Sequence, residues 1–464
     1  MFDPSITFAI FVGVSLAAAL AAAKRYGPRV SLGVGMAVSV LGPTWITMDV
    51  GLPLKVCSAV AAILLLAYCF HSPRQILSQW GILDAIVGSL AIWHVVVDVY
   101  HQGFDWTFMP RAYGEWVLPY AAGRFAMMHR GSILRLSPWF VGVASIIGLA
   151  CVFESIADAN LWSLFFTEVT DRVTRPQTAR FGSFMRAIGP AQHPIFLAVM
   201  LMSLVPWCWF CAVSPDASRR RRVAGIVGMA AIVLGIMASG SRGPVLAIVL
   251  AIPFGLSVRF RAARWTFSAV AIVGAVLLAL NLQTALDWLD DASLKKSRGE
   301  VVVIDGESEV YTGTRNRLYV AKVYVPLMLR GGPLGYGTRN VTGFPPNLPG
   351  LPSDAATRER LGIVDNSFVL VGLRFGWIGF ALLIALVSVS LVLSLTMQRT
   401  IETAQGEGTS MFALGLACTI VAITVELMTV FFHYDMAFWV LFLCGTVAGL
   451  RAYTKRSFRG LETD

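Results

Sequence analysis

Charged residues are scarce in this chain of 464 residues: Asp, Glu, Lys and Arg make up 14%, against roughly a quarter in typical soluble proteins. Hydrophobic residues reach 56%, and the mean hydropathy is +0.69. So few charges cannot cover the surface of a globular domain, which excludes an ordinary soluble protein. The composition therefore indicates an integral membrane protein.

Motifs for metals, nucleotides and disulfide frameworks are also missing. The six histidines are scattered, and nothing resembles His-Glu-x-x-His, Asp-x-Asp or a nucleotide-binding glycine motif, so we expect no metal and no cofactor. All seven cysteines lie within apolar runs, so no disulfide is expected to hold an outer loop. Cys208 and Cys211 form a Cys-x-x-Cys inside a Trp- and Phe-rich run, where packing is the expected role.

Apolar runs of about 20 residues, the length that crosses a hydrocarbon core of roughly 30 Å, recur along the chain. Each is expected to be a helix, because backbone groups find no other partner in lipid. We predict an all-α polytopic integral membrane protein with about thirteen transmembrane helices (12–14) and one large extracytoplasmic loop. The expected spans are 5–23, 30–48, 52–70, 82–100, 115–129, 136–156, 194–213, 223–239, 243–258, 265–284, 366–395, 411–432 and 435–450.

Basic residues in the short loops orient the bundle, since such loops carry excess Lys and Arg on the cytoplasmic side. If the spans alternate, the basic groups at 24–29, 130–135, 219–222, 259–264 and 451–459 all fall on that side. The loops 101–114, 157–193 and 285–364 then face outward. The formal net charge of +10 mostly reflects this bias, so no nucleic-acid partner is expected, although Arg219–Arg222 is where one could be sought.

Three parts follow from this pattern. Residues 1–284 form the N-terminal part of the bundle, residues 285–364 an extracytoplasmic loop with short amphipathic helices, and residues 365–464 the C-terminal helices and cytoplasmic tail. The loop is more polar than the rest of the chain. Unstructured connections of this length are uncommon and usually functional, so candidate site residues are sought around it.

Arginines on three outer segments are candidate anion ligands. Arg242 lies in a break of small residues, where an adjacent helix start would add N–H donors, and Arg186 precedes the span at 194. Arg315 and Arg317 open a segment with the apolar spacing of a surface helix. The alternatives are a snorkelling Arg242 at a helix end and a surface helix attracted to anionic lipid.

Two candidate bases accompany these arginines. Asp365, followed by Asn366, stands where the loop re-enters the bilayer, and desolvation there would raise the pKa of its carboxyl toward working pH. Capping the next helix is the alternative role for Asp365. His193, preceded by Gln192, could carry a proton or be structural.

The motifs in their order resemble the O-antigen ligase and polymerase family of bacterial envelopes. They are PYAAGRFAM at 119–127, RAIGPAQHPIFLA at 186–198, SGSRG at 239–243, TRNR at 314–317, GGPLGYGT at 331–338 and DNSFVLVGLRFGWIGF at 365–380. The resemblance covers roughly 119–395. It implies a metal-independent glycosyltransferase of the GT-C type that uses a glycan donor linked to polyprenyl diphosphate, such as undecaprenyl diphosphate, at the periplasmic face of the inner membrane.

Carried onto this sequence, the resemblance assigns roles to single residues. Arg242 and either Arg315 or Arg317 would hold the diphosphate, while Arg124 and Tyr336 stand within family motifs as supporting residues. The family's ligases have histidine where Asp365 stands. This departure favours the exopolysaccharide polymerase branch and leaves the base open between Asp365 and His193.

The expected function is an inverting polysaccharide polymerase. Both donor and acceptor would be polyprenyl-diphosphate-linked oligosaccharides, and the expected partners are membrane lipid and a chain-length regulator protein. A ligase that passes the glycan to another acceptor is the first alternative. The second is a lipid or polysaccharide transporter, for which Glu154 and Glu426, within or near apolar runs, would be the relevant charges.

Overall fold

A computed structural model gives the architecture of most of the chain. It describes residues 3–51, 53–72, 80–129, 131–165, 184–215, 217–260, 262–267, 269–270, 301–304, 307–310, 315–342, 346–352, 354–404 and 407–458. Most of these residues are helical. The strands form two short antiparallel hairpins, β1 (Thr47–Asp49) with β2 (Pro53–Lys55), and β3 (Val301–Ile304) with β4 (Glu307–Val310).

The helices follow the apolar runs. In the N-terminal half they are α1 (Pro4–Tyr26), α2 (Pro28–Ser39), α3 (Val56–His71), α5 (Ile82–Gln102), α6 (Phe108–Ala112), the π-helix η1 (Tyr113–Val117), α7 (Leu118–Met127), α8 (Ser132–Ala157) and the 3-10 helix η2 (Leu161–Phe165). After these come α10 (Pro194–Ser203), α11 (Val205–Val213), α12 (Arg219–Ala238), α13 (Arg242–Arg259), α16 (Asn316–Arg330), α17 (Gly337–Val341), α18 (Ala355–Arg360), α19 (Ser367–Ala404), α20 (Glu407–Leu427) and α21 (Tyr434–Phe458).

Eight helices in the described part are long and apolar enough to cross a membrane, and the pair α10–α11, bent by 40°, would add a ninth as one broken span. The prediction of an all-α polytopic membrane protein is confirmed. The expected span at 30–48 instead contains α2, of 12 residues, which Gly42-Pro43 follows closely. Across the expected span at 115–129, α6, η1 and α7 form one continuous helix from Phe108 to Met127 with a π-helical turn inside it. The span expected at 265–284 lies mostly outside the described residues.

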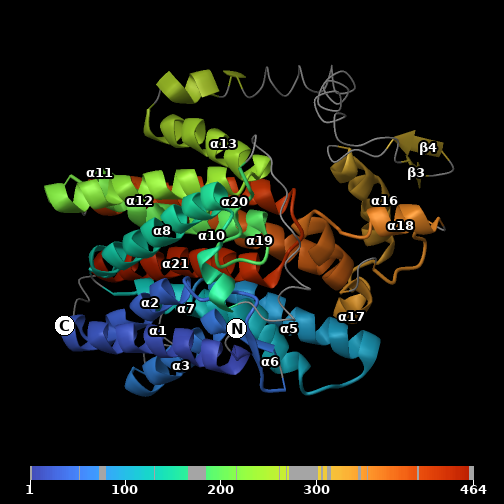
Figure 1. The fold of residues 1–464 in the computed structure, drawn as a ribbon, viewed down its shortest axis with the longest axis horizontal. Coiled ribbons are helices and arrows are strands. Elements are labelled where there is room, and N and C mark those ends of the chain that lie inside the picture. Colours follow the sequence, from blue (N-terminus) through green and yellow to red (C-terminus); the bar gives the residue numbers. More distant parts are fainter. Residues whose placement is uncertain are drawn as a thin grey trace.

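Helices α20 and α21 lie at the centre of the bundle, with α11 and α12 on one side, α1, α2 and α7 on the other, and α8 packed on both α12 and α2 (Figure 1). The backbones of α7 and α21 touch directly. A Cβ on Gly123 would collide with the carbonyl oxygen of Phe442, and one on Gly445 with that of Tyr120. Small residues allow such close approach where lipid supplies no hydrophobic drive between helices.

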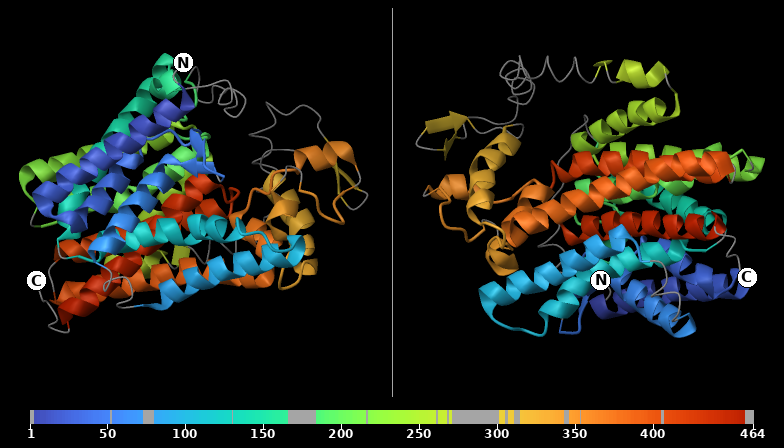
Figure 2. Two further views of the ribbon diagram at one scale, coloured as in Figure 1. Left: turned by 90° about the horizontal axis from the view of Figure 1, so that it is seen from below. Right: turned by 180° about the vertical axis from the view of Figure 1, so that it is seen from behind.

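The described part of the expected outer loop is folded. It contains β3–β4, α16, α17 and α18, which group at one end of the bundle beyond α5 and α19 (Figures 1 and 2). Tyr319 and Val302 are fully buried between these elements, with Leu361 beside them. The segment therefore has a small apolar core of its own at the end of the bundle.

Candidate active site

Arg186 forms hydrogen bonds with the turn between α12 and α13, residues 239–241. Its Nε donates to the carbonyl oxygen of Ser239 at 3.0 Å, and its Nη2 donates to Ser241 Oγ at 3.1 Å. The Ala187 amide also donates to the carbonyl oxygen of Ala238 at 3.0 Å. The segment before His193 and the SGSRG motif, more than 40 residues apart in sequence, therefore form one surface.

Arg242 is the first residue of α13, and its side chain is exposed. The first N–H groups of this 18-residue helix have no helical acceptor, and the positive end of the helix dipole lies beside the guanidinium group. This arrangement can bind an anion through one side chain and the backbone together.

Glu426, near the end of α20, faces the same turn from inside the bundle. It is 1% exposed, and a Cβ on Gly243 would lie 2.9 Å from its Oε1. Neither carboxylate oxygen has a hydrogen-bond partner among the described residues. Arg317 is near enough to act electrostatically on Glu426. A buried carboxylate with no hydrogen bond is costly, so this position requires an explanation other than stability.

Asp365 lies next to the start of α19, and Arg317 acts on it as well. Burial raises the pKa of the Asp365 carboxyl from 3.8 to about 6, against the opposing pull of Arg317. The capping role belongs to the next residue: Asn366 Oδ1 accepts from the Val369 amide at 3.0 Å. Asn366 also donates to the carbonyl oxygen of Met428 at 3.1 Å, which brings Asp365 beside the end of α20.

His193 has a local partner. Its Nδ1 accepts from the Ile195 amide at 3.3 Å and so caps α10. Its ring lies 5.5 Å from that of Phe196, which in turn stacks on His433 at 4.6 Å. Gln192, half-buried, precedes it on the same segment. The structure therefore gives His193 a structural role and places a second histidine, His433, nearby.

Arg315 and Arg317 stand at the start of α16, where Arg315 is the N-cap residue and Arg317 is exposed. Tyr336 braces the other end of this helix, because its hydroxyl donates to the carbonyl oxygen of Leu327 at 2.9 Å and its amide to that of Leu373 at 2.8 Å. Tyr336 thus positions α16 against α19.

Arg124 does not join this group of residues. It is buried in α7, and its Nε lies 2.8 Å from Asp84 Oδ1. Asp84 shares a small cavity with Arg451 and Lys455, at the end of the bundle expected to be cytoplasmic. The structure gives Arg124 an ion pair there, away from the SGSRG turn.

Glu154, which sequence suggested as a transport charge, has a full set of local partners. It accepts from the amides of Ile188 and Gly189, each at 2.9 Å, and from Asn160 Nδ2 at 2.9 Å. A carboxylate with three donors is well satisfied even when buried. Glu154 therefore fixes the segment that carries Arg186.

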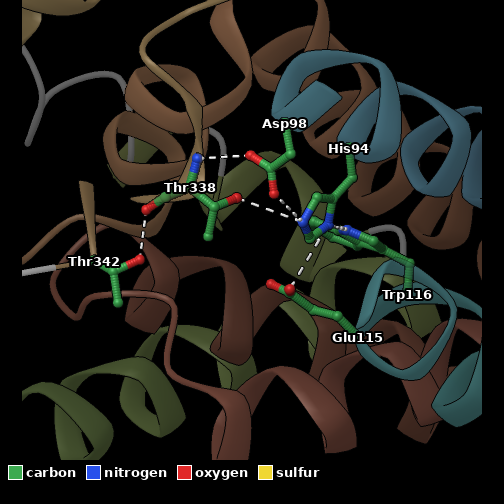
Figure 3. A network of polar contacts seen from close by, with 6 residues as sticks. All are labelled: His94, Asp98, Glu115, Trp116, Thr338 and Thr342. Atoms are coloured by element: carbon green, nitrogen blue, oxygen red, sulfur yellow. Dashed lines mark hydrogen bonds and ion pairs between the residues drawn. The ribbon is translucent and has the colours of Figure 1, made fainter. Parts of the chain in front are cut away.

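A second polar network lies beneath the segment 331–342 (Figure 3). Asp98, fully buried in α5, accepts from the Thr338 amide at 2.8 Å, and its Oδ2 is 3.2 Å from His94 Nε2. Trp116 donates to His94 Nδ1 at 3.1 Å, so this pattern of donors assigns the ring proton to Nε2. Glu115 Oε2 lies 3.7 Å from the same Nδ1.

This network holds the segment 331–342 on the bundle. His101, one turn further along α5, bonds to the carbonyl oxygen of Gly335 at 3.0 Å, and the Trp377 amide donates to that of Gly332 at 3.1 Å. The kink in α19 falls at Gly376, whose positive φ of 66° suits glycine. No motif pointed to His94 or Asp98, although two ionisable residues inside an apolar run were visible.

Glu426 and His433 were also missed as site residues. Glu426 was noted only as a transport charge, and His433 lies in the short break between two expected spans. Their positions near the start of α19 depend on how α20 and α21 pack, which no local pattern states. The break Phe-Phe-His-Tyr-Asp between apolar runs was the one available signal.

Comparison with known families gives one match: residues 227–384 fit the model of the O-antigen ligase family. The matched segment contains the SGSRG turn, α16, the segment 331–342 and Asp365. Three further candidate residues lie outside the matched segment in sequence but pack near it in the folded protein: Arg186, His193 and Glu426. No curated protein matches the chain. This match supports an O-antigen ligase/polymerase-like family, whose members process glycans, and the many apolar helices around the matched segment indicate a multi-pass membrane protein.

Proposed function

We propose that the protein is a polysaccharide polymerase that joins polyprenyl-diphosphate-linked oligosaccharide units at the periplasmic face of the bacterial inner membrane. The observation that carries this proposal is the grouping of Arg186, Arg242 and Arg317 with two carboxylates around the SGSRG turn. Both substrates would be anchored in the membrane. The reaction would need neither a metal nor another cofactor.

The diphosphate of the donor would bind at the start of α13. Arg242 would contact it through its forked guanidinium group, and the first amides of the helix would donate to its oxygens. Arg186 keeps the turn in place through Ser239 and Ser241. Arg317, from α16, would complete the positive surroundings, with Arg315 beside it.

Asp365 would act as the general base. Its raised pKa of about 6 gives a carboxylate that is ionised at neutral pH and still basic enough to accept a proton. It would take the proton from an acceptor hydroxyl, whose oxygen then bonds to the anomeric carbon of the donor sugar. The bond from that carbon to the diphosphate breaks, and polyprenyl diphosphate leaves with the electron pair. Displacement from the opposite face inverts the anomeric configuration.

The arginines would stabilise the charge that develops on the leaving diphosphate. Glu426, which lies against Gly243, is close to where the donor sugar would join the diphosphate. A sugar hydroxyl there could donate to either of its oxygens. His193 is the alternative base only if its Nδ1 gives up the cap of α10, because accepting from the Ile195 amide leaves the proton of the neutral ring on Nε2.

The test is turnover by the purified protein in lipid vesicles, with a polyprenyl-diphosphate oligosaccharide as the only substrate. A polymerase makes a ladder of lipid-linked chains from that substrate alone, whereas a ligase needs a second acceptor. Arg242→Ala should lower turnover by about 10²–10³-fold, the usual loss of one group that stabilises developing charge. Arg339→Ala, an exposed arginine on α17, is the matched control and should keep full activity.

The proposal fails if wild-type protein makes no ladder but transfers the glycan to an added acceptor, which would make it a ligase. Arg242 leaves the proposed site if Arg242→Ala and Arg339→Ala have the same activity. Protein yield and the melting temperature of each variant show whether a loss of turnover reflects misfolding.

A further inference from the structure

A hollow of about 780 Å³ lies in the side of the bundle between α8 and α12, with Arg219, Arg220 and Arg221 at one end. We name it the α8–α12 groove. Apolar side chains line its length, among them Val141 of α8 and Val227 of α12. Its volume is in the range of roughly 300–1,000 Å³ typical of small-molecule sites.

The groove belongs to the surface that faces lipid. Both α8 and α12 are long and apolar enough to span a membrane. Val223 and Val227, which line the groove, are 52% and 47% exposed, and Ile226 between them is 55% exposed. At Gly142 the wall is open, because a Cβ there would have no atom within 4 Å. Hydrocarbon would surround and enter such a groove.

No intramolecular contact in the described part of the protein neutralises the arginines at the end of the groove. They form no ion pair among the described residues, and Arg219 and Arg220 are exposed. They also stand in the first turn of α12, where positive charge opposes the helix dipole. An anion at this position would relieve both the repulsion among the arginines and their conflict with the dipole.

We propose that the α8–α12 groove binds an anionic glycerophospholipid of the membrane. An acyl chain would lie along Val141 and Val227, and the phosphate would contact Arg219, Arg220 and Arg221. Basic pockets between transmembrane helices on the cytoplasmic side bind acidic lipid headgroups by this combination of charge and shape. The site is at the opposite end of α12 from the SGSRG turn, so it is distinct from the proposed active site.

The lipid would have a structural consequence for the active site. Helix α12 ends at Ala238, whose carbonyl oxygen accepts from Ala187, and the next residue holds Arg186. A lipid fixed to the first turn of α12 and to α8 would hold this helix in place relative to the membrane. The SGSRG turn directly follows the other end of α12.

The experiment uses the full-length protein in detergent and measures retained lipid by native mass spectrometry. Phosphatidylglycerol and phosphatidylcholine with identical acyl chains are the probes. Wild type should retain phosphatidylglycerol about tenfold more than phosphatidylcholine, as expected for several basic contacts. A variant with Arg219→Gln, Arg220→Gln and Arg221→Gln should lose this preference. Lys24→Gln, Arg25→Gln and Arg29→Gln together, an equal change of charge on the same expected side, should keep it.

A second variant tests the groove without changing charge. Gly142→Leu places a side chain in the open space of the groove and should lower phosphatidylglycerol retention with all arginines present. Equal retention in wild type and the Arg219–Arg221 variant would overturn the proposal. So would equal loss in the Lys24–Arg29 control, which would indicate diffuse charge attraction. Retention of undecaprenyl phosphate without phosphatidylglycerol would overturn it as well, because the occupant would then be a polyprenyl lipid.

Discussion

Asp365 and Asn366 have separate roles, a candidate base and a helix cap, although a single Asp could have capped the helix. Asn366 caps α19 and bonds to the end of α20, while Asp365 keeps a carboxyl group whose burial raises its pKa to about 6. A residue engaged as a cap would have its carboxylate stabilised by backbone amides, and its pKa would fall. The division leaves Asp365 suited to proton transfer.

The raised pKa of Asp365 predicts how activity depends on pH. Since the base must be ionised, kcat/KM for polymer formation should rise about tenfold per pH unit below pH 6 and level off above it. Initial rates between pH 4.5 and pH 8, roughly two units on either side of that value, would show this limb. Asp365→Asn should be nearly inactive, without this limb.

Stability provides an independent measurement of the same group. A carboxyl whose pKa is raised on folding favours the folded state at low pH and opposes it once ionised, so its contribution is lost as pH rises from 3.8 through about 6. Asp365→Asn should therefore be more stable than wild type above pH 6, by at most about 3 kcal/mol and by less if water screens the group. If Asp365→Asn and wild type differed in melting temperature by the same amount at pH 4 and at pH 8, the pKa of Asp365 would not be raised.

Glu426 has the features of a residue kept for function. Replacing it with Gln removes a buried charge without changing its shape, so Glu426→Gln should fold at least as stably as wild type. Polymer formation should nevertheless fall by about tenfold or more, because a charged hydrogen-bond acceptor near the donor sugar is lost. Thermal unfolding and turnover of one preparation test both parts. An unstable but fully active variant would show that Glu426 is structural.

At the level of elements, the segment 331–342 is held by side chains from α5. Asp98 is the central acceptor, because it serves both the Thr338 amide and His94. This segment follows α16 directly and is braced to it through Tyr336. The position of Arg317, at the start of α16, therefore depends on contacts at the other end of that helix.

Asp98→Ala should loosen this attachment. It leaves the Thr338 amide and the neutral His94 ring without their acceptor, and a buried donor left unsatisfied costs about 1–3 kcal/mol. Hydrogen exchange of 331–342, followed by mass spectrometry, should become faster while exchange in α20 and α21 changes little. Asp105→Ala, which removes an exposed carboxylate that accepts from the Thr107 amide, is the control. Equal exchange in both variants would mean that Asp98 does not hold the segment.

At the level of the whole molecule, the basic loops predict which side each segment faces. A single cysteine at Arg339 should react with a membrane-impermeant maleimide added outside spheroplasts, because α17 is expected to be extracytoplasmic. A cysteine at Arg220 should react only after the membrane is permeabilised. Among the native cysteines, five are buried and two partly buried, which keeps the background low. Labelling of Arg220→Cys from outside would reverse the proposed orientation.

Local features of the chain were enough to predict the class of protein and the segments in which to look for a site. Helix formation in lipid depends on the length and apolarity of each run, and the sides depend on the charge of short loops, so both are local properties. The SGSRG turn and Asp365 stood out for the same reason, as polar breaks between apolar runs. The short α2 was not foreseen, because the apolar residues around it give no sign of where the helix ends.

Which polar residues come together depends on how the helices pack. Nothing near Glu426 in the chain indicates that it lies against Gly243, or that Arg317 acts on it from a separate segment. The same holds for Glu154, two of whose three donors are amides more than 30 residues away. Contacts between helices depend on their crossing and on the shapes of facing side chains, which a single apolar pattern leaves open.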